Sequence, residues 1–221
     1  MGLAVYGLYL CVRQAVVNER GKRQAIRNAE RVAQLEDRTG IHVEPHLQRL
    51  VLPYPRLLHA LNAAYAVLNV GLTVGWLISL FRRRHPAYHR LRRATSLATL
   101  GALPAFLFFP CAPPRKLDYI VDTIADVSGV DLESSPIGKL YDPIAAMPSI
   151  HVAYAVVTGY GLAQTSPRRR VRALGRVYAL LVSFIVFVTG NHYILDAIVG
   201  GVLGGAALKI ARWLSREEAR R

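Results

Sequence analysis

The residues best suited to chemistry lie near the end of the chain, in the sequence Gly-Asn-His-Tyr-Ile-Leu-Asp at positions 190–196. His192 and Asp196 are four residues apart, so on a helix they share a face and can form a hydrogen bond. A carboxylate within an apolar segment is costly unless it is paired or hydrated. We therefore expect Asp196 to orient the imidazole and leave its other nitrogen basic, as in activated nucleophiles. The alternative is a buried pair that only holds helices together.

A second segment, Met-Pro-Ser-Ile-His at positions 147–151, opens another apolar run. Pro148 at a helix start leaves first-turn amides unpaired, and the helix dipole favours an anion there. Ser149 adds a hydroxyl, and His151 adds a group that can carry a proton near neutral pH. These residues predict an anion site with a general acid or base. In the alternative, Ser149 only caps the helix and His151 lies among lipid headgroups.

A third segment, Phe-Pro-Cys-Ala-Pro-Pro-Arg-Lys at positions 109–116, combines three prolines with two basic residues. Proline lacks an N–H and fixes φ, so the segment ends the preceding helix in a stiff turn. The turn presents Arg115 just outside the apolar region, and a guanidinium suits bidentate recognition of phosphate. Lys116 can add a second positive charge. An ordinary arginine at the membrane interface is the alternative.

Long apolar segments must position these residues. Hydrophobic residues make up 52% of the 221 residues and charged residues 19%, which excludes a disordered chain, and two cysteines are too few for a disulfide scaffold. Residues 57–81 carry no formal charge and are long enough to cross a bilayer. Weaker candidate spans are residues 2–17, 94–110, 149–165, 177–191 and 193–214. The sequence predicts an all-α, polytopic membrane bundle of about six transmembrane helices, or five if residues 2–17 are not inserted. Glycine pairs at 200–201 and 204–205 predict close helix packing.

Basic residues gather in three short segments, 82–93, 166–176 and 209–221, which hold 16 of the 28 lysines and arginines. By the positive-inside rule these segments are cytoplasmic, and so are both termini. Residues 111–147 carry six acidic and three basic residues, which suits the outer face. The net charge of +14 therefore reflects membrane topology. No basic face with aromatic or groove-reading elements indicates a nucleic-acid partner.

Residues 18–40 have helical spacing, with small apolar residues on one stripe and charged residues elsewhere. This pattern predicts an amphipathic helix at the outer interface, and a lid over the polar segments is the alternative. With the first candidate span it forms an N-terminal unit, residues 1–53, before a transmembrane bundle, residues 54–221. Asp118, Asp122 and Asp126 recur every four residues, which predicts the solvated face of a short helix rather than a metal site.

The three polar segments together resemble the type-2 phosphatidic acid phosphatase superfamily, which shares its fold with vanadium haloperoxidases. Positions 148–151 and 192–196 match its Pro-Ser-x-His and His-x-x-x-Asp signatures. The likeness extends over most of the chain from about residue 30. The Ser-Arg pair that the superfamily carries seven and six residues before the last histidine is replaced by Ile185 and Val186, and its Lys…Arg-Pro motif is absent.

The residues within and around these motifs are similar to those of bacterial relatives of the inositolphosphotransferase branch, whose eukaryotic members make inositol phosphorylceramide. These residues are Ala-Pro-Pro-Arg at 112–115, Ala-Ala-Met-Pro-Ser-Ile-His at 145–151 and Gly-Asn-His-Tyr-x-x-Asp at 190–196. Gln34-Leu35-Glu36 and residues 40–48 also resemble that branch.

The resemblance implies a reaction on a phospholipid or lipid phosphate at the outer leaflet of a bacterial plasma membrane. His192 would attack phosphorus and form a phosphohistidine, and Asp196 would stabilise the imidazolium. His151 would protonate the leaving oxygen and later deprotonate the acceptor. First-turn amides and three side chains would hold the phosphoryl oxygens: Arg115, Lys116 and Ser149. No metal or other cofactor is required.

The sequence leaves two possible acceptors for the phosphoryl group. Water would make the protein a phosphatase, whereas inositol or another alcohol would make it a phosphotransferase; the lipid and the oligomeric state are equally open. The other classes are a proton-coupled transporter, in which His192 and Asp196 relay protons, and a catalytically silent scaffold. The polar groups lie near one face and leave the inner half of each span apolar, which disfavours the transporter. Alanine at His151 or His192 would be tolerated by a scaffold, whereas an enzyme would lose turnover.

Overall fold

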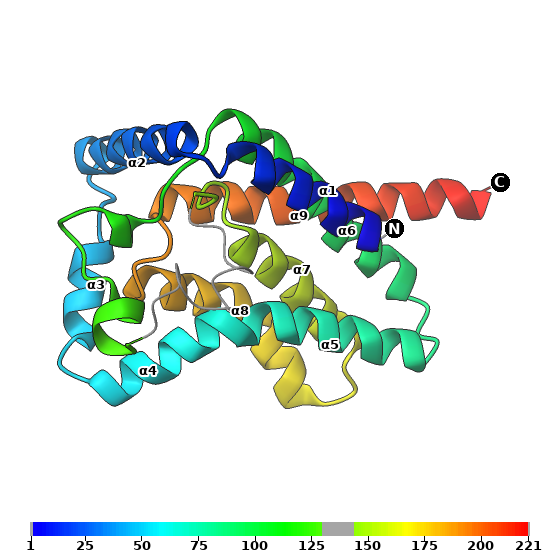
Figure 1. Ribbon diagram of the computed structural model, residues 1–221. Coiled ribbons are helices and arrows are strands. Elements are labelled where there is room, and N and C mark those ends of the chain that lie inside the picture. Colours follow the sequence, from blue (N-terminus) through cyan, green and yellow to red (C-terminus); the bar gives the residue numbers. More distant parts are fainter. Residues whose placement is uncertain (1, 130–143, 221) are drawn as a thin grey trace.

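The computed structural model describes residues 2–129 and 144–220, and these residues are largely helical (Figure 1). The α-helices are α1 (Gly2–Val16), α2 (Glu19–Thr39), α3 (Glu44–Val51), α4 (Pro55–Ala63), α5 (Asn69–Arg82), α6 (Tyr88–Phe108), α7 (Ile150–Thr165), α8 (Arg169–Val188) and α9 (Ile194–Arg220). Short helical turns are η1 (Ala64–Leu68), η2 (Pro114–Lys116) and η3 (Thr123–Val127). The described ranges contain no β-strand, only an isolated bridge between Cys111 and Ala145. The predicted all-α class is confirmed.

Helix α7 packs against α5, α6, α8 and α9 at the centre of the bundle. Glycines allow this close approach, because a Cβ on Gly200 would lie 2.3 Å from the carbonyl oxygen of Ser149. A Cβ on Gly204 would lie 2.6 Å from the carbonyl oxygen of Ala153. The predicted packing role is therefore confirmed for these two glycines. Gly205 faces open space instead.

Large apolar side chains cover the outside of the bundle, including Val70, Val74 and Ile78 at four-residue spacing on α5. Helix α8 exposes a similar set: Val177, Leu180, Leu181 and Phe184. Soluble proteins rarely expose apolar patches of this extent, so the surface indicates a lipid environment. Helices α8 and α9 are long and apolar enough to cross a membrane, and α4 and α5, which meet at 48°, supply a third span if they act as one. The chain is a membrane protein with at least two candidate spans, and six spans stay a prediction.

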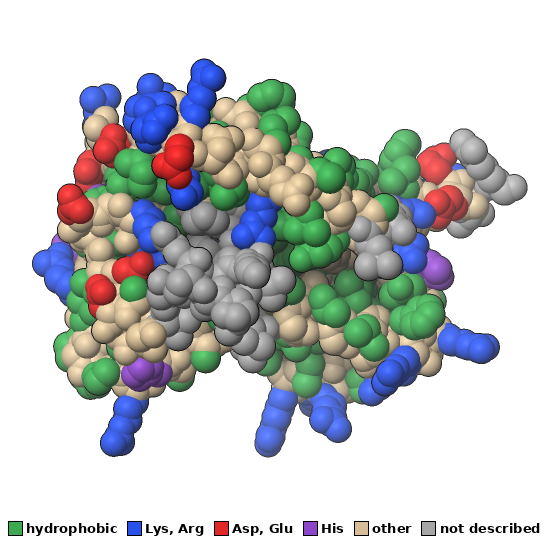
Figure 2. All heavy atoms as spheres, viewed as in Figure 1, with side chains coloured by type: hydrophobic (Ala, Val, Ile, Leu, Met, Phe, Trp, Pro, Cys, Tyr) green, Lys and Arg blue, Asp and Glu red, His purple; other side chains and the backbone are tan. Residues whose placement is uncertain are grey.

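The two ends of the bundle differ in what they carry. Both chain termini and the turn between α5 and α6 lie at one end, while α2, α3 and the segment with η2 and η3 lie at the other (Figure 1). On the face drawn in Figure 2, charged side chains gather at both ends of the bundle, over α2 and α3 and around the far end of α9, and hydrophobic side chains cover much of the surface between them. Residues 130–143 of the predicted outer loop lie outside the described residues. The orientation of the bundle in the plasma membrane stays a prediction.

Helix α2 has the limits that the sequence predicts. Asn18 caps it by accepting a hydrogen bond from the amide of Gly21 at 2.9 Å, and Gly40, with φ of 71°, ends it. The apolar stripe is buried against Cys111, Ala112 and Tyr193. Helix α2 is therefore part of the wall around the polar segments. Its predicted place at the membrane interface is a separate matter, which stays a prediction.

Candidate active site

The two histidines and the aspartate predicted to do chemistry meet where α7 and α9 begin. Nδ1 of His192 lies 3.1 Å from Oδ2 of Asp196, and Nε2 of His192 lies 3.3 Å from Nδ1 of His151. His192 is 3% exposed and Asp196 is fully buried. Because a carboxylate only accepts hydrogen bonds, Nδ1 of His192 carries the hydrogen and Nε2 is the basic nitrogen. Nδ1 of His151 then donates to that nitrogen. The arrangement is the one that an oriented nucleophile requires.

The turn between α8 and α9 brings His192 to this position. Gly190 has φ of 68°, in the left-handed region that glycine adopts without a Cβ clash. Its carbonyl oxygen accepts a hydrogen bond from the amide of Arg115 at 2.8 Å. The turn is thereby attached to the proline-rich segment, so the polar segments at 109–116 and 190–196 support each other.

Ser149 joins the start of α7 to the start of α9. Its hydroxyl accepts a hydrogen bond from the amide of Val152 at 3.2 Å, and its own amide donates to the carbonyl oxygen of Asp196 at 3.1 Å. Helix α7 begins two residues after Pro148, so this proline precedes the cap instead of forming the first turn. Ser149 is a helix cap in this structure, and its predicted contact with phosphate stays a prediction.

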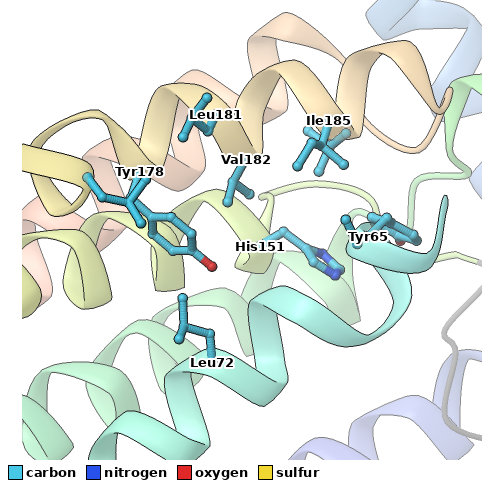
Figure 3. Close-up of a pocket in the computed structure, with 10 residues that line it drawn as sticks. Tyr65, Leu72, His151, Tyr178, Leu181, Val182 and Ile185 are labelled. Atoms are coloured by element: carbon cyan, nitrogen blue, oxygen red, sulfur yellow. The ribbon is translucent and has the colours of Figure 1, made fainter. Parts of the chain in front are cut away.

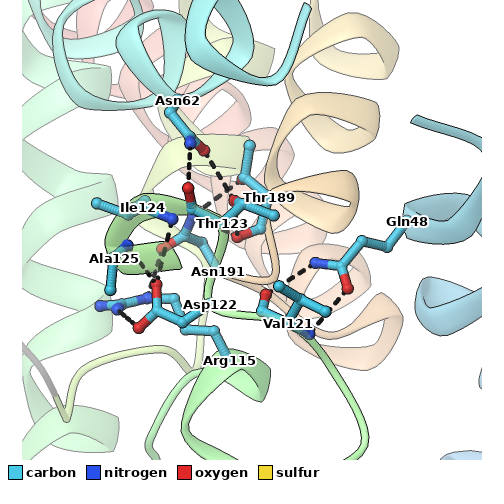
Figure 4. A network of polar contacts seen from close by, with 10 residues as sticks. All are labelled: Gln48, Asn62, Arg115, Val121, Asp122, Thr123, Ile124, Ala125, Thr189 and Asn191. Carbon is cyan, nitrogen blue, oxygen red and sulfur yellow. Dashed lines mark hydrogen bonds and ion pairs between the residues drawn. The ribbon is translucent and has the colours of Figure 1, made fainter. Parts of the chain in front are cut away.

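Arg115 is buried within the protein, with only 6% of its surface exposed, although the sequence places it just outside the apolar region. Its Nη1 lies 2.7 Å from Oδ2 of Asp122, and its Nε donates to Oδ1 of Asn191 at 3.0 Å (Figure 4). Asn191 is held in turn by Thr189, to which its amide nitrogen donates twice. The guanidinium is thus fixed in direction beside the turn that carries His192. Lys116, next in the chain, is half-buried.

The short helix predicted across three aspartates is wrong in extent. Asp122 is the N-cap of η3, because its Oδ1 accepts hydrogen bonds from the amides of Ile124 and Ala125 at 3.2 Å each. The helical turn starts only after this residue and leaves Asp118 outside it. Asn62 on α4 anchors the turn by donating to the carbonyl oxygen of Thr123 at 2.7 Å (Figure 4).

An apolar cavity of about 220 Å³ lies beside His151, between η1, α5 and α8 (Figure 3). Tyr65 from η1 stacks on the His151 ring, with ring centroids 4.6 Å apart. Ile185 and Val186 form part of the wall, together with Leu181. The two positions where the superfamily carries a polar Ser-Arg pair therefore line an apolar space. The chemistry of this cavity suits a hydrocarbon chain whose polar end reaches the histidines.

Two buried glutamates that the sequence analysis did not single out as site residues contact the start of α9. Oε1 of Glu36 accepts a hydrogen bond from the amide of Leu195 at 2.6 Å, and Oε1 of Glu44 accepts one from the amide of Ile194 at 2.7 Å. Burial and the neighbouring Glu44 carboxyl raise the pKa of Glu36 to about 9. A signal was present in the sequence, because Glu36 continues the helical spacing of the apolar stripe on α2.

The chain belongs to the PAP2 superfamily, the type-2 phosphatidic acid phosphatases, because the model of that family matches residues 30–210. The crystal structure of LpxE from Aquifex aeolicus has a similar fold, with a TM-score of 0.55 over 75% of this chain and 92% of that chain. The two sequences are 24% identical, so this likeness concerns the fold. A search of curated proteins gave no match. The predicted superfamily is confirmed, and the inositolphosphotransferase branch stays a prediction.

Proposed function

We propose that this protein is a membrane enzyme that removes or transfers the phosphoryl group of a lipid phosphate through a phosphohistidine at His192. The observation that carries the proposal is the buried His192, with Nδ1 on Asp196 and Nε2 facing His151. Membership of the PAP2 superfamily supports the same class of reaction. The apolar lining of the cavity next to His151 disfavours the transporter, because a proton relay needs polar groups to continue along its path.

The proposed reaction has two steps. Nε2 of His192 attacks phosphorus, the bond from phosphorus to the lipid oxygen breaks, and His151 gives that oxygen a proton. Asp196 stabilises the imidazolium that forms. His151 then takes a proton from the acceptor, which attacks the phosphohistidine and releases His192. General acid–base catalysis of this kind contributes about 10²–10⁴-fold to the rate.

Charge on the phosphoryl oxygens needs fixed donors around the reacting atom. Arg115 is proposed to supply most of this stabilisation, because Asn191 and Asp122 already hold its guanidinium in one orientation. The Ser149 hydroxyl, the first amides of α7 and Lys116 are proposed to add to it. These donors carry out the charge neutralisation without a metal.

Substrate binding requires a movement of His151. Its Nδ1 lies 3.3 Å from Nε2 of His192, which is about where a phosphorus atom must be placed for attack. The His151 ring must therefore turn aside to admit the phosphoryl group. The stacked Tyr65 limits the directions in which it can turn. The lipid chain is proposed to occupy the apolar cavity on the same side.

The test uses purified protein in detergent with EDTA, a panel of ³²P-labelled lipid phosphates, and inositol present or absent. Release of labelled phosphate supports a phosphatase. Label on inositol supports a transferase, which the resemblance of the motif residues to the inositolphosphotransferase branch favours. His192→Ala and His151→Ala should abolish either product, while His89→Ala, an exposed residue on α6, should not. Turnover that survives His192→Ala, or none with any lipid of the panel, would overturn the proposal.

A further inference from the structure

The start of α9 is capped in an unusual way. A helix leaves its first amides without partners inside the helix, and a single side chain just before the helix commonly accepts from one of them. Here the partners are Glu44 on α3 and Glu36 on α2, which lie 150 residues or more away in the sequence. The two amides belong to consecutive residues, Ile194 and Leu195. Asp196, the partner of His192, is the next residue.

The carboxyl groups of the two glutamates also lie close to each other at the start of α9. Oε2 of Glu36 and Oε2 of Glu44 are both buried, and neither accepts a hydrogen bond from a donor group in the described part of the chain. The two carboxyl groups are within hydrogen-bonding reach of each other. Two carboxylates at such a distance cannot both be ionised, so one proton lies between them. The raised pKa of Glu36 agrees with Glu36 as the group that donates to Glu44.

The proton also matters for charge at the catalytic pair. Asp196 is fully buried, and its carboxyl group interacts electrostatically with Glu36. Three ionised carboxylates around one helix start would repel one another in a dry environment. With one proton held by the pair, the positive end of the α9 dipole faces one negative charge fewer.

We propose that Glu36 and Glu44 are positioning residues for His192, acting as a carboxyl pair that fixes the first turn of α9 and so holds Asp196 on Nδ1 of the imidazole. The inference rests on the proposed function of His192. It gives α2 and α3 a role in the reaction through their hydrogen bonds to the first amides of α9.

The first test asks whether the pair controls the state of His192, and it needs no substrate. The protein is labelled with ¹⁵N-histidine in detergent, and the His192 signals are assigned by their loss in His192→Ala. Glu36→Ala should shift the Nδ1 signal that reports the hydrogen bond to Asp196. Glu36→Gln should restore it, because an amide still accepts from Leu195 and donates to Glu44. Glu30→Ala, an exposed change on the same helix, is the control.

The second test measures hydrolysis of dioctanoyl phosphatidic acid in mixed micelles. A shift of about 1 Å in a reacting group costs on the order of 100-fold, so Glu36→Ala should lower kcat by that amount with KM changed little. Glu36→Gln and Glu44→Gln should each stay within about threefold of wild type, on the scale of a modestly perturbed hydrogen bond. The double glutamine variant should fall well below both, because two amide groups then face each other with no acceptor.

The outcomes separate the two proposals. Normal His192 signals and normal kcat in Glu36→Ala would overturn the positioning role, and so would a double glutamine variant as active as the single ones. A wild-type protein that hydrolyses no lipid phosphate would overturn the proposed function instead. In that case the ¹⁵N signals still decide whether the glutamates hold Asp196 against His192.

Discussion

Asn191 accepts a hydrogen bond from Nε of Arg115 at 3.0 Å, so the residue just before His192 in the chain also orients the guanidinium. His192, the proposed nucleophile, and the guanidinium of Arg115 therefore share one support. A change in this turn alters both the position of Nε2 of His192 and the direction of the guanidinium. The relationship predicts effects on turnover that exceed those on stability.

Asn191→Ala should lower kcat/KM by about 10- to 100-fold, the cost of losing a hydrogen bond to a charged group. The fall should be similar for every lipid phosphate that the wild type accepts, because the lost bond concerns phosphate and not the lipid chain. Phosphate release and thermal unfolding in detergent are the measurements. Unchanged kcat/KM in a folded variant would show that Asn191 does not orient Arg115 for catalysis.

Gly200→Ala should disturb the site through packing alone. Its Cβ would lie 2.3 Å from the carbonyl oxygen of Ser149, so α7 and α9 must separate at the level of the histidines. Overpacking of this kind costs about 1–3 kcal/mol, and activity should fall with stability. Gly201→Ala is the matched control, because its nearest neighbour would be Val152 at 4.0 Å. Equal stability of the two variants would contradict the prediction.

The stability of the protein should fall as pH rises because of Glu36. Its pKa is about 9 in the folded protein against an ordinary value of 4.5, so the folded protein keeps a proton that the unfolded chain releases. The contribution is complete below pH 4.5 and is lost between pH 4.5 and about 9. Ionisable groups near this carboxyl are Glu44, Asp196, Tyr119, Tyr193 and Cys111.

The measurement is the thermal unfolding of wild type and Glu36→Gln in detergent at several values between pH 5 and 9. The glutamine variant lacks the titrating group, so its stability should depend less on pH over this range. The difference between the two slopes has an upper limit of about 1.4 kcal/mol per pH unit for one proton. Parallel curves would mean that Glu36 is already ionised in the folded protein.

Leu181→Trp should discriminate between lipids by chain length. Leu181 lines the cavity beside His151, whereas its neighbour Leu180 does not and is 72% exposed. A tryptophan at 181 fills space that a long hydrocarbon chain would occupy, so KM should rise for a long-chain lipid phosphate and change less for a dioctanoyl one. Leu180→Trp should leave both values unchanged. Equal effects on the two lipids would argue against a chain in this cavity.

Local signals in the sequence were enough to predict several elements. Asn18 and Gly40 mark the ends of α2 because a side-chain cap and a left-handed residue are strong local signals. Residues 57–81 were predicted as one span, but η1 interrupts it and the flanking helices meet at 48°. That segment contains no proline, so the sequence carries no signal for the bend. The bend places Tyr65 against His151.

Some contacts of the candidate site could likewise be predicted from local spacing, and others could not. The spacing of His192 and Asp196 is a local feature, so their contact could be predicted from helix geometry. The pairing of Arg115 with Asp122 and Asn191 depends on where two loops meet, which spacing does not specify. The contact of Glu44 with α9 was harder still to predict, because its partner amide lies 150 residues away in the sequence. The buried stripe of α2 pointed to Glu36, and the family resemblance covered both glutamates without giving either a role.

The N-terminal end of α1 and the C-terminal end of α9 lie at the opposite end of the bundle from the start of α9, which follows His192 by two residues (Figure 1). In sealed liposomes, a cleavable tag on either terminus should then lie on the opposite side of the membrane from the histidines. A protease added outside should remove the tag only from molecules whose histidines face the lumen. Proteoliposomes of this protein can therefore be sorted by orientation with a tag, and turnover can be assigned to the molecules that the added lipid reaches.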